Sequence, residues 1–315
     1  MACQLAPPPK VLSHGAETFG DLYAKTMQCQ SKDDGRFALT HFPMQVEDGV
    51  AKGAPVLMTS GMFTGRGFWV SPKGLGIAAE LAKKGFEVYI YERRGVGESP
   101  RDYLQKDQAR AGLNEAILYD LPAIQGLIAQ RNSQPLFMMG HSFGGVALAA
   151  ALATNHMNRG GINGLVLFGS QLTVDKPFLN PPWSVIPKLS SKALGYFPSK
   201  KLKMGPFNES PAAMQDAVNW VSAAKARGDF VFWEGFNKLH MPVLAISGSK
   251  DDVDPAEGVE YLMNQFASKD KTFTLLSKAN GNLKDYDHVG MVVSKEAAQE
   301  VWPMVAEWML SRKVK

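Results

Sequence analysis

One serine of the chain lies where its hydroxyl could act as a nucleophile. Ser142 belongs to the run Gly140-His141-Ser142-Phe143-Gly144, which fits the pattern G-x-S-x-G. An apolar run precedes it and a segment of helical period follows, which is the strand–turn–helix context of a nucleophile elbow. The hydroxyl would then stand at a helix N-terminus, where the dipole favours developing negative charge. The alternative is a glycine-rich turn with an exposed serine.

A serine hydroxyl is a weak nucleophile at neutral pH and needs a base that is oriented by an acid. In an elbow protein these groups follow in the chain order serine, acid, histidine. Three histidines follow Ser142 along the chain: His156, His240 and His288. We predict His288 as the base because it lies between the last strand-like run and the last helical segment. The alternative for this position is a structural loop histidine.

The acid is expected after the penultimate strand, where the chain reads Gly248-Ser249-Lys250-Asp251-Asp252-Val253-Asp254-Pro255. We choose Asp251 because it lies nearest to the end of the strand, and Asp252 is the alternative. Asp254 is interpreted as a helix N-cap, because Pro255 and Glu257 complete the pattern of a capping box. The spacing of the aspartates does not continue into a calcium loop, so we expect no metal.

Acyl chemistry also needs two backbone N–H donors that hold the oxyanion. Phe143, the residue after the nucleophile, would supply one of them. The loop 60–65 after the first central strand would supply the other, and we choose Met62. No cofactor is expected, because the run 95–97 is only a fragment of a dinucleotide fingerprint and no Walker sequence occurs.

Short apolar runs alternate with helical segments and would position these residues. The strand-like runs are Val56–Thr59, Val88–Tyr91, Leu136–Gly140, Leu165–Phe168, Val243–Ser247 and Thr272–Leu276. The helical segments are Leu75–Lys84, Asn114–Gln130, Phe143–Thr154, Ala256–Phe266 and Ala297–Ser311. Asp33-Asp34-Gly35 between Ala24–Ser31 and Arg36–Phe42 is typical of a hairpin. This order predicts an α/β fold with a mostly parallel sheet, an N-terminal antiparallel hairpin and helices on both faces.

Residues 171–240 interrupt the alternation with seven prolines and three of the six tryptophans. We expect a helical cap over 171–240, inserted between the two parts of one core, 1–170 and 241–315. Phe178, Trp183 and Phe197 would line an apolar acyl pocket in the cap. The cap also holds nine basic and five acidic residues, which accounts for the whole net charge of +4. Its lysines could attract an anionic lipid or a carboxylate substrate, and the alternative is a solvated face.

The composition excludes several classes of protein. A chain of 315 residues with 45% hydrophobic and 20% charged residues is typical of a globular protein. The net charge is too small for a nucleic-acid binder, and no apolar run approaches the roughly 18 residues of a membrane span. Two cysteines are too few for a disulfide framework, and the first ten residues do not resemble a signal peptide. We therefore expect a cytoplasmic protein, with a peripheral protein as the alternative.

Several of these stretches together resemble the α/β-hydrolase superfamily. They are the elbow, the late pair Asp251 and His288, and the run 92–99, which is similar to the D-x-R-G-x-G-x-S loop with Glu92 in place of Asp. Four further stretches are similar to motifs of the acid lipase and sterol-esterase branch: Asp34–Leu39, Tyr119–Ala123, Tyr286–His288 and Gly248–Asp251. The last of these favours Asp251 over Asp252. The oxyanion loop begins with Ser60-Gly61, where that branch usually has His-Gly.

These residues and the resemblance predict a serine hydrolase that cleaves carboxylic esters in the manner of an esterase or lipase. The substrate would be a small acyl ester or a lipid-like ester, converted through an acyl-enzyme on Ser142. A thioesterase or acyltransferase with the same triad is the first alternative. A non-catalytic binding protein is disfavoured, because Ser142, Asp251 and His288 are all present in the expected order.

Overall fold

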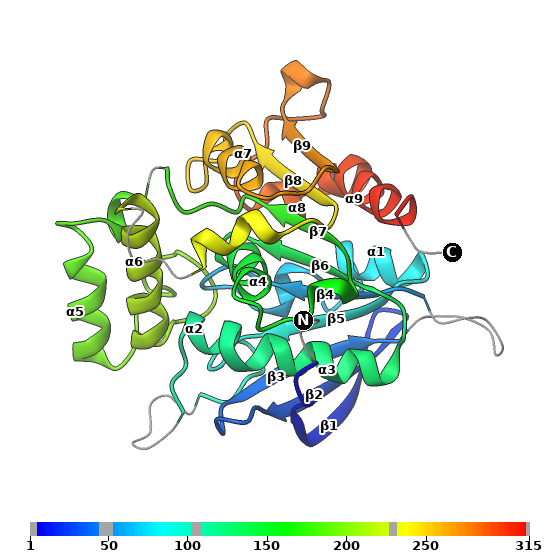
Figure 1. The fold of residues 1–315 in the computed structure, drawn as a ribbon, viewed down its shortest axis with the longest axis horizontal. Helices are drawn as coiled ribbons and strands as arrows, with labels where there is room; N and C mark the ends of the chain where they lie inside the picture. Colours follow the sequence, from blue (N-terminus) through cyan, green and yellow to red (C-terminus); the bar gives the residue numbers. More distant parts are fainter. Residues whose placement is uncertain (1–4, 44–52, 102–108, 175, 227–231, 313–315) are drawn as a thin grey trace.

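The computed structural model describes residues 5–43, 53–101, 109–174, 176–226 and 232–312. In this part of the chain nine strands form one sheet, in the order β1-β2-β3-β5-β4-β6-β7-β8-β9 (Figure 1). The strands are β1 (Lys10–Phe19), β2 (Leu22–Gln30), β3 (Arg36–Phe42), β4 (Pro55–Thr59), β5 (Glu87–Glu92), β6 (Leu136–His141), β7 (Ile162–Phe168), β8 (Val243–Gly248) and β9 (Lys271–Leu276). The helices are α1 (Ile77–Lys83), α2 (Leu113–Glu115), α3 (Leu121–Arg131), α4 (Phe143–Ala153), α5 (Val185–Leu194), α6 (Pro211–Ala226), α7 (Ala256–Asn264), α8 (Gly290–Val293) and α9 (Lys295–Leu310).

The sheet changes from antiparallel to parallel at β5. The pairs β1–β2, β2–β3 and β3–β5 are antiparallel, and the five pairs from β5 to β9 are parallel. Every residue of β4, β5, β6 and β8 is buried, as expected when helices cover both faces of a sheet. The predicted mixed sheet with an N-terminal hairpin is therefore confirmed.

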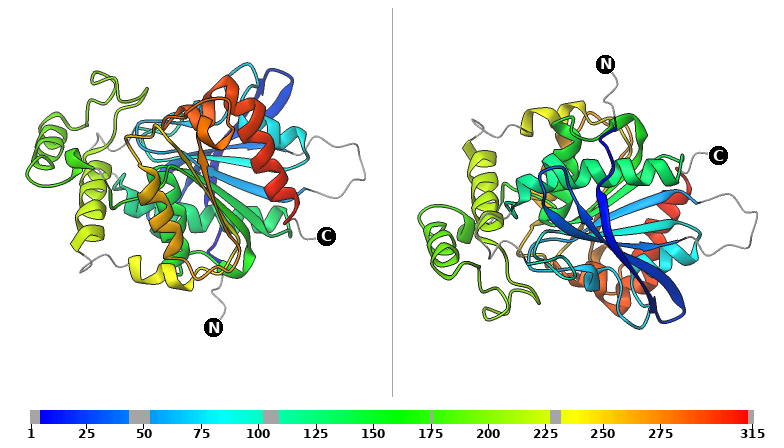
Figure 2. Two further views of the ribbon diagram at one scale, coloured as in Figure 1. Left: turned by 90° about the horizontal axis from the view of Figure 1, so that it is seen from above. Right: turned by 90° about the horizontal axis from the view of Figure 1, so that it is seen from below.

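Successive residues of the parallel strands face two separate cores. In β6, Met138 packs into one core with α3, α4 and α7, whereas Phe137 and Met139 pack into the other with α1, α8 and α9. This alternation follows from the period of two along a strand. Figure 2 shows the two layers of helices on opposite faces of the sheet. Because β4, β6, β7 and β8 run in parallel, their carboxyl ends lie at the same end of the sheet. Ligands bind at this end in open α/β sheets.

One prediction about secondary structure needs correction, and one strand was not predicted. The segment expected as one helix over 114–130 consists of α2, a π-helical turn at Ala116–Asp120 and then α3. Pro122 has no N–H to donate to a carbonyl one turn earlier, which explains an irregular turn just before it. The strand β1 was not expected. It is an edge strand with mostly exposed residues, so it lacks the apolar signal of a buried strand.

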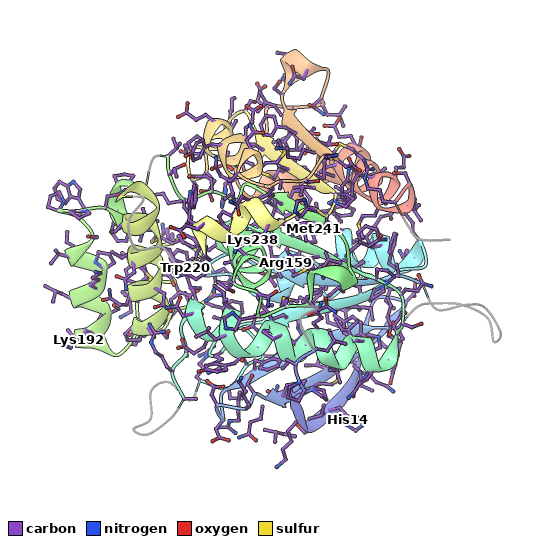
Figure 3. The ribbon with its side chains drawn as sticks, viewed as in Figure 1. His14, Arg159, Lys192, Trp220, Lys238 and Met241 are labelled. Carbon is purple, nitrogen blue, oxygen red and sulfur yellow. The ribbon has the colours of Figure 1, made fainter. Side chains whose placement is uncertain are left out.

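The chain between β7 and β8, residues 169–242, is called the β7–β8 segment below. Its helices α5 and α6 lie side by side at one side of the molecule, with α5 outermost (Figure 1). Trp220 on α6 faces α4 and packs 6.1 Å from the ring of Phe143, whereas Lys192 on α5 is exposed (Figure 3). In α5 the buried positions are Pro187 and Ser191, while Leu189 is 61% exposed. The apolar side of α5 therefore faces solvent.

Candidate active site

Ser142 lies in a sharp turn between β6 and α4. Its φ of 53° and ψ of −131° place a non-glycine residue in a strained conformation, of the kind that clusters at functional sites. A side chain on Gly140 would overlap Gly145, and one on Gly144 would overlap the carbonyl of Ser60. The glycines that the pattern supplied are therefore required by the close approach of the backbone. The strand, the strained turn and the helix thus have the local geometry that a nucleophile elbow requires.

Asp251 and His288 meet at the same edge of the sheet. The Nδ1 atom of His288 lies 2.9 Å from Oδ2 of Asp251, which follows β8. The other oxygen of Asp251 accepts the backbone N–H groups of Val253 and Asp254 at 3.1 and 2.7 Å. The carboxylate is thus fixed by its own loop, and it holds one nitrogen of the imidazole in place.

His141, the residue before Ser142, supports the loop that carries His288. Its Nε2 atom lies 2.9 Å from the backbone carbonyl of His288, and the two rings are 4.3 Å apart. Burial and the neighbouring His288 hold the pKa of His141 well below its usual value. His141 is therefore neutral, and its Nε2–H donates to the carbonyl. Its buried Nδ1 has no hydrogen-bond partner among the described residues.

Asp254 is not the N-cap that we expected. Helix α7 begins at Ala256 after Pro255, and no side chain caps it. The Asp254 side chain instead turns inward and is fully buried, where its Oδ2 accepts the hydrogen bond of Ser142 Oγ at 2.9 Å. A buried carboxylate needs hydrogen-bond donors and a counter-charge, and this site supplies both.

The other oxygen of Asp254 is held by the β7–β8 segment. Its Oδ1 accepts Gln171 Nε2 at 2.8 Å and forms a close ion pair with Lys176 Nζ. Burial raises the pKa of Asp254, and the ammonium of Lys176 opposes that rise. Because a buried charge is tolerated when it is paired and hydrogen-bonded, these contacts stabilise the charged form of the carboxylate beside Ser142.

His288 consequently lies between two carboxylates of one loop. Asp251 contacts its Nδ1, and Oδ2 of Asp254 lies 3.8 Å from its Nε2. The hydrogen of the Ser142 hydroxyl is directed to Asp254 rather than to His288. Within the described residues, Ser142 and His288 are therefore connected through Oδ2 of Asp254, which contacts both side chains.

The loop 60–65 passes directly over the elbow. A side chain on Gly61 would come within 2.9 Å of the Cβ atom of Ser142. Met62 is partly buried in this loop, and Phe143 occupies the first turn of α4, where backbone N–H groups have no acceptor within the helix. The two residues predicted as oxyanion donors therefore come from the loop and the helix that adjoin Ser142.

Glu209 of the β7–β8 segment fixes this loop. Its Oε1 accepts the backbone N–H of Phe63 at 2.7 Å, and Phe63 has a φ of 67°, which is strained for a bulky residue. Arg93 donates to both oxygens of Glu209 at 2.6 and 3.0 Å and to the carbonyl of Gly61 at 3.3 Å. The bidentate pair ties the loop, the core and the segment together.

Two of the three aromatic residues proposed for an acyl pocket lie together beside this loop. The ring of the buried Phe197 is 5.8 Å from Phe63 and 5.9 Å from Phe178. Trp183, the third of these residues, is 59% exposed.

Sequence reasoning missed the contacts of several charged and polar residues around Ser142, His288 and the loop 60–65. These residues are Asp254, Lys176, Gln171, Glu209 and Arg93. Asp254 could have been noticed as a third carboxylate close to Asp251, but the cap pattern explained it locally. Lys176 and Glu209 carry no motif, because their partners lie 78 and 116 positions away in the sequence.

Among the helices that the structure describes, none combines the length and apolar character needed to cross a bilayer. Within the same residues, no three His, Cys, Asp or Glu side chains form a group that could hold a metal ion.

Comparisons with known proteins agree with this fold. Residues 71–280 match the family described as serine aminopeptidase, S33, and a search of curated sequences found no match. Among solved structures, the monoacylglycerol lipase of Paleococcus ferrophilus is 18% identical, with 88% of this chain and 99% of that chain covered and a TM-score of 0.61. A soluble variant of the monoglyceride lipase of Saccharomyces cerevisiae, in complex with a substrate analogue, is 17% identical over 98% and 100%, with a TM-score of 0.63.

A thermophilic esterase from Thermogutta terrifontis is 17% identical over 92% of this chain and 99% of that chain, with a TM-score of 0.62. At such identities the likeness shows the fold. The family match spans more than half of the chain and includes the elbow. The chain therefore belongs to the serine aminopeptidase, S33 family and has the α/β-hydrolase fold.

Proposed function

We propose that this protein is a serine hydrolase that cleaves carboxylic esters, with Ser142 as nucleophile, His288 as base and Asp251 as the orienting acid. The observation that carries the proposal is the strained turn of Ser142 at the same sheet edge as the 2.9 Å pair of His288 and Asp251. Structural neighbours described as esterases and monoacylglycerol lipases support an ester substrate.

The reaction would follow the Ser-His-Asp scheme. The Ser142 hydroxyl turns from Asp254 to Nε2 of His288, and its oxygen attacks the acyl carbon as the proton passes to the imidazole. Asp251 keeps the Nδ1–H tautomer and stabilises the imidazolium. The backbone N–H groups of Met62 and Phe143 would hold the oxyanion. His288 then protonates the leaving alcohol, and water cleaves the acyl-enzyme by the same route.

We also propose that residues 171–240 act as a cap on a core made of 1–170 and 241–315. The support is that this part of the chain supplies Lys176 and Glu209 to the site. Phe178 and Phe197 would line the acyl pocket, since they lie beside the oxyanion loop. The exposure of Trp183 gives that residue no such support.

We also propose that this chain is related to the acid lipase and sterol-esterase branch, and the motif Tyr119–Ala123 supports this relation. Its Asp120 is fully buried and accepts hydrogen bonds from Tyr91 and Arg94. Arg94 also pairs with Asp33 in the β2–β3 hairpin. Asp120 thus connects the π-helical turn with β5 and the hairpin. These contacts explain why an aspartate is needed at this position of the motif.

The test is turnover of p-nitrophenyl esters from acetate to palmitate by the wild type and by Ser142→Ala. We expect hydrolysis by the wild type and a loss on the order of 10⁴-fold or more in the variant, with the circular dichroism spectrum unchanged. A fluorophosphonate probe should label Ser142 in the wild type. An undiminished rate in Ser142→Ala would disprove the nucleophile. Cleavage of aminoacyl p-nitroanilides with no cleavage of any ester would replace the ester proposal with a peptidase.

A further inference from the structure

The Asp254 carboxylate is an acceptor that a Ser-His-Asp triad does not require. Its Oδ1 is held by Gln171 and Lys176, and its Oδ2 is held by the Ser142 hydroxyl. All of these contacts are buried. The side chain therefore has one oxygen committed to the β7–β8 segment and one oxygen facing the reacting atoms.

Acylation changes the surroundings of that second oxygen. When Ser142 Oγ is part of an ester it carries no hydrogen, so Oδ2 of Asp254 loses its donor. A buried charged acceptor without a donor is costly, so a new donor is favoured at this position. The atom lies 2.9 Å from Oγ, to which the acyl carbon is then bonded.

One water molecule can serve both acceptors that remain. Oδ2 of Asp254 and Nε2 of His288 are 3.8 Å apart. A water at about 2.8 Å from each of them can donate one hydrogen to Oδ2 and the other to Nε2. The lone pairs of that water are then free to attack the acyl carbon. A water held by one acceptor alone would have no fixed orientation.

We propose that Asp254 is a positioning residue that orients the hydrolytic water during deacylation. This inference rests on the proposed function and adds the step that selects water as the acyl acceptor. The water oxygen bonds to the acyl carbon as its proton moves to Nε2 of His288. The bond from carbon to Oγ then breaks, the proton passes to Oγ, and the carboxylic acid leaves. Asp254 keeps its charge throughout and regains the Ser142 hydroxyl as its donor.

Lys176 and Gln171 make this role possible. Their bonds to Oδ1 fix the direction of Oδ2 toward Ser142 and His288. The ammonium of Lys176 also balances the carboxylate, so that a negative charge beside the developing oxyanion is compensated. The role therefore needs the ion pair as a unit.

The test compares water with methanol as acyl acceptors. Methanol has one O–H, so it can give its hydrogen to His288 but cannot donate to Asp254 at the same time. In Asp254→Asn we expect hydrolysis of the acyl-enzyme to slow by at least about tenfold, while methanolysis changes much less. The ratio of methyl ester to free acid should therefore rise about tenfold. Product analysis by chromatography with p-nitrophenyl butyrate in dilute methanol gives this ratio.

Pre-steady-state kinetics give a second readout. We expect Asp254→Asn to keep a burst of p-nitrophenol near one per site, followed by a slower steady phase, with the acyl-enzyme visible by mass spectrometry. Asp252→Asn is the matched control, since Asp252 lies in the same loop and is exposed. Its burst and product ratio should equal those of the wild type.

Asp254→Asn leaves the buried Lys176 without a counter-ion and could fail to fold. The double variant Asp254→Val/Lys176→Met removes the acceptor and the charge together, and it should show the same rise in the product ratio. An unchanged ratio in a folded variant overturns the inference, as does an equal slowing of both acceptors or a loss of the burst. These outcomes leave the serine hydrolase intact, because that proposal is tested by the wild type and Ser142→Ala.

Discussion

The core and the β7–β8 segment contribute different kinds of group to the same site. The core supplies the groups proposed to react, Ser142, Asp251 and His288, each on a loop that follows a parallel strand. The segment supplies Lys176 and Glu209, which pair with buried charges of the core. The proposed chemistry thus belongs to the strand ends, and the segment controls the charge and the backbone geometry around them.

The two regions also differ in how completely their apolar side chains are buried. The central strands are buried along their whole length, which gives the core the stability of apolar packing. In the segment, α5 exposes its apolar side, whereas α6 and residues 232–241 bury apolar side chains against the core. Arg110 pairs with Asp216 on α6, and Trp220 donates to Asn114 at 2.9 Å. The segment is therefore attached through apolar side chains of α6 and of residues 232–241, together with these polar links.

Breaking the core part of the site should have the largest effect. Asp251→Asn keeps the shape of the acid but favours the wrong tautomer of His288, so kcat for p-nitrophenyl esters should fall by about 10⁴-fold. The exposed neighbour serves as the control, and Asp252→Asn should keep its activity. A large loss in Asp252→Asn with none in Asp251→Asn would reverse the assignment of the acid.

Breaking the link from the segment should affect stability and rate together. Glu209→Gln leaves the buried guanidinium of Arg93 without a counter-charge, which should cost about 3–5 kcal/mol in the free energy of unfolding. The loop over Ser142 loses its anchor, so kcat should fall by up to about 10²-fold. Urea unfolding and ester kinetics measure the two effects.

A compensating variant separates these effects. Arg93→Met/Glu209→Gln removes both charges and should recover most of the stability while the rate stays low, because the loop is still less well held. Full activity in Glu209→Gln would show that the loop keeps its geometry without the segment.

The smallest expected effect concerns the opposite end of the sheet, where the buried Glu87 carboxylate accepts three side-chain hydrogen bonds. Burial alone would raise the pKa of Glu87, but hydrogen bonds from His41, Asn132 and Tyr89 lower it to about 2. Since the folded pKa lies below the unfolded one, the stabilisation is present above about pH 4.5 and is lost as the pH falls toward 2. We expect a contribution of order 3 kcal/mol at neutral pH.

Urea unfolding between pH 7 and pH 3 measures this contribution. Glu87→Gln should be less stable at pH 7, and its stability should depend less on pH over that range. A pH dependence equal to that of the wild type would show that other carboxylates dominate the acid response.

Local patterns were sufficient for the parallel strands, the β2–β3 hairpin and the glycine-rich turn at Ser142, but not for the exposed edge strand β1. The parallel strands read as short apolar runs because both of their faces are buried, and the elbow needs glycines at fixed positions. Local patterns did not predict the contacts of residues whose partners lie far away in the sequence. Asp254 matches a helix cap locally, yet Lys176, 78 positions away, and Ser142 draw it into the interior. Glu209 has no local signal at all.

The hydrogen bond between Glu209 and the loop over Ser142 limits how the β7–β8 segment could be replaced by the corresponding segment of a related protein. An imported segment that lacks a carboxylate at this place would leave Arg93 buried and unpaired beneath the carbonyl of Gly61, and Phe63 would lose the acceptor of its N–H. The β7–β8 segment is thus not a structurally independent unit. A chimaera must keep matching residues at positions 93 and 209. Changing the substrate range by exchanging the segment would also require the loop 60–65 that Glu209 anchors.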